Sequence, residues 1–256
     1  MDAFVGYATR VFILPPDAEP DFGGLYIQLA PPEHTRGVIM FPIEGGRWLV
    51  TLLGACRDYP PTDEDGYLAF ARSLRSTMLH DTIKDAEPAS PIWGHRHTAN
   101  HRRHYERLSA MPAGLLALGD SLCAFNPIYG QGMTVAALQA EALGSLLAKR
   151  MRTAVDAPRL SSTMQRRMAK IADQAWMVSA SADRRYPVTG RPGPALRLLY
   201  RYMDQVMLAG TVDETVANTF LRVLNMLAKP TLLQRPDILL RVLHGARRAR
   251  RNHPDR

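Results

Sequence analysis

The chain changes its pattern along its length, from short apolar runs separated by turn residues to long helical segments. Residues 1–54 hold runs rich in β-branched and aromatic residues, with Pro, Gly and Asp between them. These runs are Phe4–Leu14, Leu25–Ala30, Gly37–Glu44 and Arg47–Gly54. Beyond Gly132, apolar residues recur at helical spacing. This order predicts an α+β fold, with an antiparallel sheet first and helices last.

Local signals refine the first region. Gly45-Gly46 predicts a hairpin between the third and fourth strands, because glycine adopts positive φ without steric cost. Thr62 and Asp65 form a capping box that predicts a helix start. The apolar face of that helix would be Leu68, Ala71, Leu74 and Leu79. An antiparallel sheet of this kind packs one face on a core and leaves the other exposed or over a pocket.

The rest of the chain has one more strand signal and then helices. Pro91–Ala99 predicts a strand, and a short basic helix is expected after it. The later helices are expected at Met133–Arg150, Ser162–Ser181, Pro194–Ala209, Val212–Ala228 and Pro236–Arg247. Thr211 and Glu214 would form a second capping box.

Composition places the chain among ordinary globular proteins, with 46% apolar and 22% charged residues. Its two cysteines, Cys56 and Cys123, lie too far apart in the sequence for a CxxC metal site and exclude a disulfide framework. This usage suits a reducing cytoplasm. No apolar run is long enough to span a membrane, and Met1-Asp2 does not open a signal peptide. We expect a cytoplasmic protein.

The net charge is +8, and much of the excess lies in His95–Arg107 and Arg247–Arg256. No nucleic-acid-binding motif accompanies these segments, so no nucleic acid partner is expected. Several imidazoles of the first segment could face a zinc ion, but the arginines among them would repel a cation. No metal site is predicted. The segment is interpreted as a solvated basic surface, or alternatively as a contact for an anionic ligand.

The stretch Leu115–Ala140 carries the strongest chemical signal. Its apolar start predicts a buried strand that ends at Gly119-Asp120. Ligand crevices of open α/β sheets lie at the carboxyl ends of strands, which is where Asp120 would stand. Pro127 stiffens the next loop, and Gly130 and Gly132 remove side chains from a helix entrance. A bare helix N-terminus offers N–H donors and partial positive charge, while Asp120 can accept hydrogen bonds from a polyol. A tight strand-to-helix turn capped by Asp120 is the structural alternative.

The order strand, Gly-Asp, Pro127, Gly-x-Gly, helix resembles the second flavin-binding motif of the aromatic-hydroxylase class of FAD-dependent monooxygenases, the p-hydroxybenzoate hydroxylase-like enzymes. The resemblance implies that Asp120 holds the ribityl chain of FAD, and that Gly119 is also one of the cofactor-binding residues. It implies that Pro127 borders the isoalloxazine ring. The backbone around the same ring would come from Gly130, Gln131, Gly132, Met133 and Thr134.

Two positions depart from the family pattern, since Cys123 stands where many members have His and Thr134 where many have Asn. Cys123 is interpreted as a buried, inert thiol, with a reactive thiolate as the alternative. No GxGxxG segment occurs in the sequence, and the chain opens on a sheet strand. The resemblance therefore implies the C-terminal part of a monooxygenase, with its ADP-binding half missing through truncation or on a separate chain.

The resemblance also implies roles for three regions. Residues 1–114 would form the substrate-binding sheet, residues 115–150 the flavin-binding strand-loop-helix, and residues 151–256 a helical C-terminal region. The completed enzyme would hydroxylate an aromatic or isoprenoid small molecule with NAD(P)H and O2. Pocket-lining candidates on the sheet are Tyr7, Arg10, Phe41 and Pro42. The alternative function is a non-catalytic binding or interaction module whose exposed seam takes a partner or a second copy.

The last helices mix apolar and basic residues, as in Ile238–Arg251. Such helices can cover a core, close a pocket or lie on an anionic membrane. Covering the apolar face of the sheet is the expected role, and peripheral membrane contact is the alternative.

Overall fold

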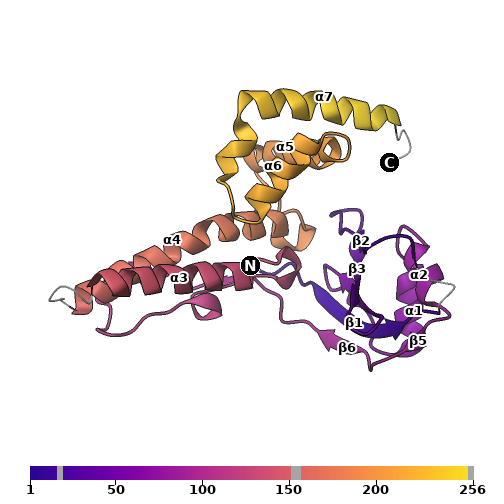
Figure 1. The fold of residues 1–256 in the computed structure, drawn as a ribbon, viewed down its shortest axis with the longest axis horizontal. Helices are drawn as coiled ribbons and strands as arrows, with labels where there is room; N and C mark the ends of the chain where they lie inside the picture. The colour runs from indigo at the N-terminus through magenta and orange to yellow at the C-terminus, as the bar shows by residue number, and fades with distance from the viewer. Residues whose placement is uncertain (16–19, 151–156, 253–256) are drawn as a thin grey trace. The chain divides into compact units, whose positions relative to one another are not determined.

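The computed structural model describes residues 1–15, 20–150 and 157–252, without the side chains of 149–150 and 157–158 (Figure 1). The chain divides into two compact units. Unit 1 contains Met1–Asn100 and Ala182–Arg191, and unit 2 contains His101–Ser181 and Pro192–Arg256. The three functional regions expected from the sequence remain a proposal about roles.

The sheet of unit 1 is antiparallel, which confirms the predicted α+β class. Its strand order is β2-β3-β4-β1-β5, and β6 also pairs with β1. The strands are β1 Gly6–Ile13, β2 Leu25–Ile27, β3 Arg36–Ile43, β4 Arg47–Gly54, β5 Glu87–Pro88 and β6 Trp93–His95. The predicted hairpin is formed between β3 and β4, with φ of +78° at Gly45 and +67° at Gly46. The strand expected over Pro91–Ala99 is limited to β6.

One face of this sheet is covered by α1, Glu64–Arg72, and α2, Met78–Ile83. Asp63 caps α1 by accepting from the Gly66 N–H at 2.8 Å, so the predicted Thr62 cap was wrong by one residue. Tyr67 reaches across this core and donates its hydroxyl hydrogen to the Val50 carbonyl at 3.0 Å. The buried core residues are Ala8, Phe12, Leu14, Ile27, Val38, Met40, Trp48, Val50, Leu52, Tyr67, Phe70, Ala71, Leu74, Leu79 and Ile83.

Unit 1 is closed by a segment that comes late in the chain. Asp183 accepts a hydrogen bond from the Asn100 side chain at 2.5 Å, and both groups are buried. Tyr186, in the same segment, is also buried, and a 3-10 turn follows at Pro187–Thr189. Residues 182–191 therefore complete a unit whose other residues end at Asn100.

Unit 2 is helical, as predicted. Its helices are α3 Gly132–Arg150, α4 Ala157–Asp183, whose last two residues count with unit 1, α5 Pro194–Gly210, α6 Glu214–Leu224 and α7 Pro236–Asn252. Asp213, rather than Thr211, caps α6 by accepting from the Val216 N–H. No helix in the described residues is long and apolar enough to cross a membrane.

The last three helices share a core of their own. Gly245 of α7 crosses Ala209 of α5 so closely that a Cβ at Gly245 would lie 2.9 Å from the Ala209 Cβ. Other buried residues of this core are Val206, Val216, Val223, Leu233, Ile238, Val242 and Ala246. Within unit 1, α1 and α2 cover the core face of the sheet. The expectation that the last helices cover an apolar face of the sheet stays a prediction.

Candidate functional site

The Gly-Asp stretch does not contain the expected strand. Residues 115–118 belong to no strand in the described chain, and Leu115 is exposed. Gly119–Ser121 form a 3-10 turn that starts with Gly119 at φ +56°. A strand needs a neighbour to satisfy its backbone groups, and here glutamine side chains take that place.

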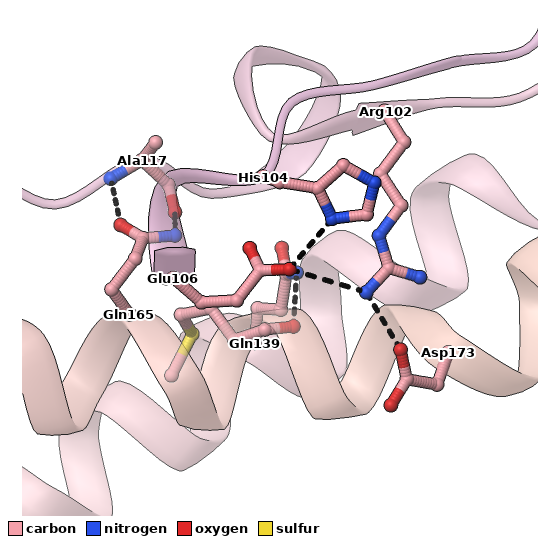
Figure 2. Close-up of polar contacts among 8 residues, drawn as sticks. Arg102, His104, Glu106, Ala117, Gln139, Gln165 and Asp173 are labelled. Atoms are coloured by element: carbon pink, nitrogen blue, oxygen red, sulfur yellow. Dashed lines mark hydrogen bonds and ion pairs between the residues drawn. The ribbon is translucent and has the colours of Figure 1, made fainter. Parts of the chain in front are cut away.

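Two fully buried glutamines hold the segment before Asp120 (Figure 2). Gln165 of α4 accepts from the Ala117 N–H at 2.9 Å and donates to the Ala117 carbonyl at 3.1 Å. Gln139 of α3 accepts from the Gly119 N–H at 2.7 Å and donates to the Met168 carbonyl at 3.0 Å. The two carboxamides thus fix the backbone on the approach to the Gly-Asp turn.

The loop after the turn is shaped by proline and glycine, as expected. Pro127 begins a 3-10 turn, Pro127–Tyr129, which Asn126 caps through the Ile128 N–H. Gly130 ends the turn at φ +64°, in the left-handed region that favours glycine. Gln131 is buried and donates to the carbonyls of Tyr129 and Leu224. Gln131 therefore anchors the loop.

The helix entrance lies beside Asp120. A Cβ built at Gly132, the first residue of α3, would lie 3.9 Å from Asp120 Oδ1. Asp120 is exposed, as are Met133 and Thr134 in the first turn of α3. That turn contains no acidic residue, and the first N–H groups of a helix have no acceptor within it. A carboxylate acceptor and a set of backbone donors therefore stand together, open to a ligand.

The basic segment before the turn supports it. β7, His101–Arg102, pairs with β8, Cys123–Ala124. Arg103 lies beside the turn, with its guanidinium 3.3 Å from the Asp120 carbonyl oxygen. The expected basic helix is a 3-10 turn, Tyr105–Arg107.

Two acidic residues balance part of the positive charge of this segment (Figure 2). Arg102 pairs with Asp173 of α4 at 2.7 Å and lies 3.8 Å from Glu106. Glu106 also accepts from His104 at 2.8 Å. Burial alone would raise the pKa of Glu106, but the hydrogen bond from His104 and the charges of His104 and Arg102 outweigh it, so the pKa lies below its usual range.

Neither a metal site nor a reactive thiol is formed by the described residues. Within residues 1–15, 20–150 and 157–252, no three His, Cys, Asp or Glu side chains gather where they could hold a metal ion. Cys123 is buried, and burial raises the pKa of its thiol to about 11. A thiol with this pKa is almost fully protonated near neutral pH and is a poor nucleophile.

The second face of the sheet, opposite α1 and α2, is only partly covered within unit 1. Strand register places Tyr7, Thr9, Tyr26, Ile39, Phe41, Leu49, Thr51, Trp93 and His95 on it, and we call these residues the open face. Trp93, Tyr26 and Phe41 are exposed. Arg10 points to the other face, where it pairs with Glu64 at 2.6 Å, and Pro42 also belongs to that other face. Of the four pocket-lining candidates, only Tyr7 and Phe41 therefore lie on the open face.

A separate groove runs along the α3–α4 hairpin, with a volume of about 710 Å³. Its walls include Leu138 and Leu146 of α3, and Arg167 and Ile171 of α4. None of the residues predicted to contact flavin lines it. The groove is therefore distinct from the Gly-Asp turn.

The buried glutamines and the acidic partners of Arg102 were missed by sequence reasoning. Gln139 could have been noticed, since it interrupts the apolar helix face that contains Val135 and Ala142. Asp173 lies 71 positions from Arg102, and no local pattern links them.

One curated relative matches most of the chain. Protein Rv3254 of Mycobacterium tuberculosis (strain H37Rv) is 28% identical over 229 residues, which are 89% of this chain and 48% of Rv3254. The chain therefore spans about half the length of this relative. No protein-family model matches the sequence.

Solved structures show what fold the chain has. The Diels-Alderase PyrE3 is similar with a TM-score of 0.57 and 19% identity, over 88% of this chain and 44% of PyrE3. The flavin-dependent halogenase CmlS is similar with a TM-score of 0.55 and 17% identity, over 82% of this chain and 41% of CmlS. OxyS anhydrotetracycline hydroxylase from Streptomyces rimosus is similar with a TM-score of 0.53 and 18% identity, over 89% of this chain and 41% of OxyS. The chain has the fold of roughly half of each of these larger enzymes.

Proposed function

We propose that this chain is the substrate-binding and flavin-contacting part of an FAD-dependent monooxygenase that hydroxylates an aromatic or isoprenoid small molecule. An ADP-binding half, on the same or another chain, would complete the enzyme. The observation that carries the proposal is the position of the exposed Asp120 carboxylate beside the glycine-bare N-terminus of α3.

The residues present fit a flavin. Gly130 and Gly132 leave space, since a Cβ at Gly130 would meet nothing within 4 Å and one at Gly132 only Asp120. Asp120 would accept hydrogen bonds from the ribityl hydroxyls. The backbone from Gly130 to Thr134 would border the ring, with Pro127 in the loop before it. The N–H groups and dipole of α3 suit an electron-rich ring edge that gains negative charge on reduction.

The chemistry divides between cofactor and protein. FAD, reduced by NAD(P)H, would supply the activation of O2 and the oxygen transfer. The protein's part would be to hold the ring and exclude water. Gln165 and Gln139 would keep the Gly-Asp turn in place, and the exposed Arg103 guanidinium would add positive charge near an anionic ligand group. No acid or base of this chain is assigned to a proton transfer.

The open face of the sheet suits the proposed substrate. Ring surfaces for a flat or isoprenoid molecule would come from Tyr7, Tyr26, Phe41 and Trp93. The hydroxyls of Thr9 and Thr51, on the same face, form a hydrogen bond at 2.9 Å. Aromatic surface with a few polar groups is typical of small-molecule sites. CmlS and OxyS, whose names describe a halogenase and a hydroxylase, share the fold, and this likeness supports the proposal at the level of fold.

The test is flavin binding by the chain alone and by a completed protein. The completed protein would be this chain fused to the part of Rv3254 that it does not match. We expect weak or no FAD binding by the chain alone, and a yellow fusion with flavin absorption and a raised Tm in FAD. A folded fusion that stays colourless and whose Tm does not respond to FAD would contradict the proposal and favour a non-catalytic interaction module.

A further inference from the structure

The outward side of α7 combines leucines with arginines, and we propose that it binds an anionic membrane surface. The face consists of Leu240, Leu243, His244, Arg247 and Arg251, which we call the α7 outer face. Membrane binding by this face would not depend on flavin binding.

The face follows from helical geometry. The side of α7 that packs on α5 and α6 carries the buried residues Ile238, Val242, Gly245, Ala246 and Ala249. Steps of three and four residues place the α7 outer face on the opposite side. Leu240 and Leu243 are 58% and 54% exposed there. Two adjacent leucines this exposed on one helix form an apolar strip that water solvates poorly.

The same face carries Arg247 and Arg251 and lies in a strongly basic part of the chain. Asp237 is the one acidic residue between Asn225 and Asn252, and it is paired with Arg235 at 3.0 Å. The basic residues in that range are Lys229, Arg235, Arg241, Arg247, Arg248, Arg250 and Arg251. Arg241 pairs with Asp213, and Arg250 donates to Gln205. Among the described residues, Arg247, Arg248 and Arg251 have no ionic partner, so their charge is available outside the molecule.

The order along the helix favours a lipid surface over other anionic partners. On the α7 outer face, the leucines lie in the first half of the helix, and Arg247 and Arg251 lie in the second half. Apolar and cationic groups are therefore neighbours on one side. A nucleic acid would leave the leucines in water. A leaflet of anionic lipid takes leucines at the acyl boundary and arginines among the head groups. Arginine stems can also reach from the apolar boundary to the phosphates.

The experiment is flotation of the purified chain with vesicles. The probes are vesicles of phosphatidylcholine with phosphatidylglycerol, and vesicles of phosphatidylcholine alone, each at about 0.05 M and about 0.5 M salt. We expect binding to the anionic vesicles at low salt, weaker binding at high salt, and none to phosphatidylcholine alone. A chain that stays at the bottom with anionic vesicles at low salt would overturn the proposal.

Variants locate the contact. Arg247→Gln with Arg251→Gln should lower vesicle affinity about 25-fold, at about fivefold for each arginine near the surface. Leu240→Ser with Leu243→Ser should weaken binding at both salt concentrations. The matched control is Arg166→Gln with Arg222→Gln, which removes two exposed arginines from α4 and α6. All variants change exposed side chains and should keep the Tm. If the control weakens binding as much as the α7 pair, the contact is nonspecific charge and the proposal fails.

Discussion

The Gln165 carboxamide pairs with both backbone groups of Ala117, accepting from its N–H at 2.9 Å and donating to its carbonyl at 3.1 Å. A backbone strand would offer the same donor and acceptor pair. The side chain therefore satisfies backbone groups in a segment that belongs to no strand.

Gln165→Leu should destabilise the protein by about 1–3 kcal/mol, because it keeps the size of the side chain and removes both partners of Ala117. The Ala117 amide should also exchange its hydrogen faster. Thermal unfolding and hydrogen exchange measure the two effects. Gln234→Leu, at an exposed position, is the control and should change neither. An unchanged exchange rate at Ala117 in Gln165→Leu would show that the pairing does not hold this segment.

The proposed roles of Asp120 and Gly132 in FAD binding can be tested with variants that leave the fold intact. In the completed protein, Asp120→Ala should weaken FAD binding about 10- to 100-fold, since it removes a charged hydrogen-bond acceptor. Gly132→Val should weaken it too, by filling the helix entrance. Both should leave Tm without FAD nearly unchanged, because Asp120 is exposed and a Cβ at Gly132 meets only Asp120. Flavin fluorescence measures the affinity, and full retention by both variants would refute the placement.

Stability of unit 1 should fall in acid through Asp58. Arg36 donates to this carboxylate from Nε at 2.7 Å and from Nη2 at 2.8 Å. The hydrogen bond from Arg36 lowers the pKa of Asp58, against an opposing effect of burial. A lowered folded pKa means that the stabilisation is present above the unfolded pKa of about 3.9 and disappears as pH falls through the folded pKa.

The size of this effect should be modest, at about 1 kcal/mol, because both side chains are about one-third exposed and solvent screens the pair. Urea unfolding at a series of pH values measures it. Asp58→Asn should be less stable than the wild type near neutral pH and should approach it below the folded pKa. A difference that stays constant from neutral to acid pH would contradict this assignment.

Two glycines in helices should respond oppositely to alanine. Gly245→Ala should destabilise the α5–α7 packing by about 1–3 kcal/mol, because the new methyl would lie 2.9 Å from the Ala209 Cβ. A methyl added at Gly144, in α3, would meet nothing within 4 Å, so Gly144→Ala should stabilise by about 0.5–1 kcal/mol through helix propensity. Thermal unfolding of the pair checks both signs. Equal effects of the two substitutions would rule out close packing at Gly245.

The sheet and the long helices were predictable from sequence because their periodicity is local. The strands β1, β3 and β4 follow their apolar runs within a few residues, and Gly45-Gly46 sets the hairpin. The helix caps were each missed because an aspartate just inside the expected start, Asp63 or Asp213, took the capping role.

The candidate site was only partly predictable. The glycines and Pro127 could be read directly, since backbone conformation limits the residues that fit. Whether Leu115–Leu118 became a strand depended on a neighbour elsewhere in the chain, and the neighbours are Gln165 and Gln139. Those contacts join residues 48 and 20 positions apart, which a local pattern cannot reveal.

The late arrival of residues 182–191 in unit 1 has a consequence for synthesis on the ribosome. Asn100 emerges long before Asp183, so the buried side-chain pair that joins them cannot form while the chain between them is still being made. Unit 1 cannot finish folding until most of the α3–α4 part of unit 2 has been translated, because residues 182–191 complete its interior. A nascent chain stalled at residue 181 should therefore resist protease less well than one stalled beyond residue 191.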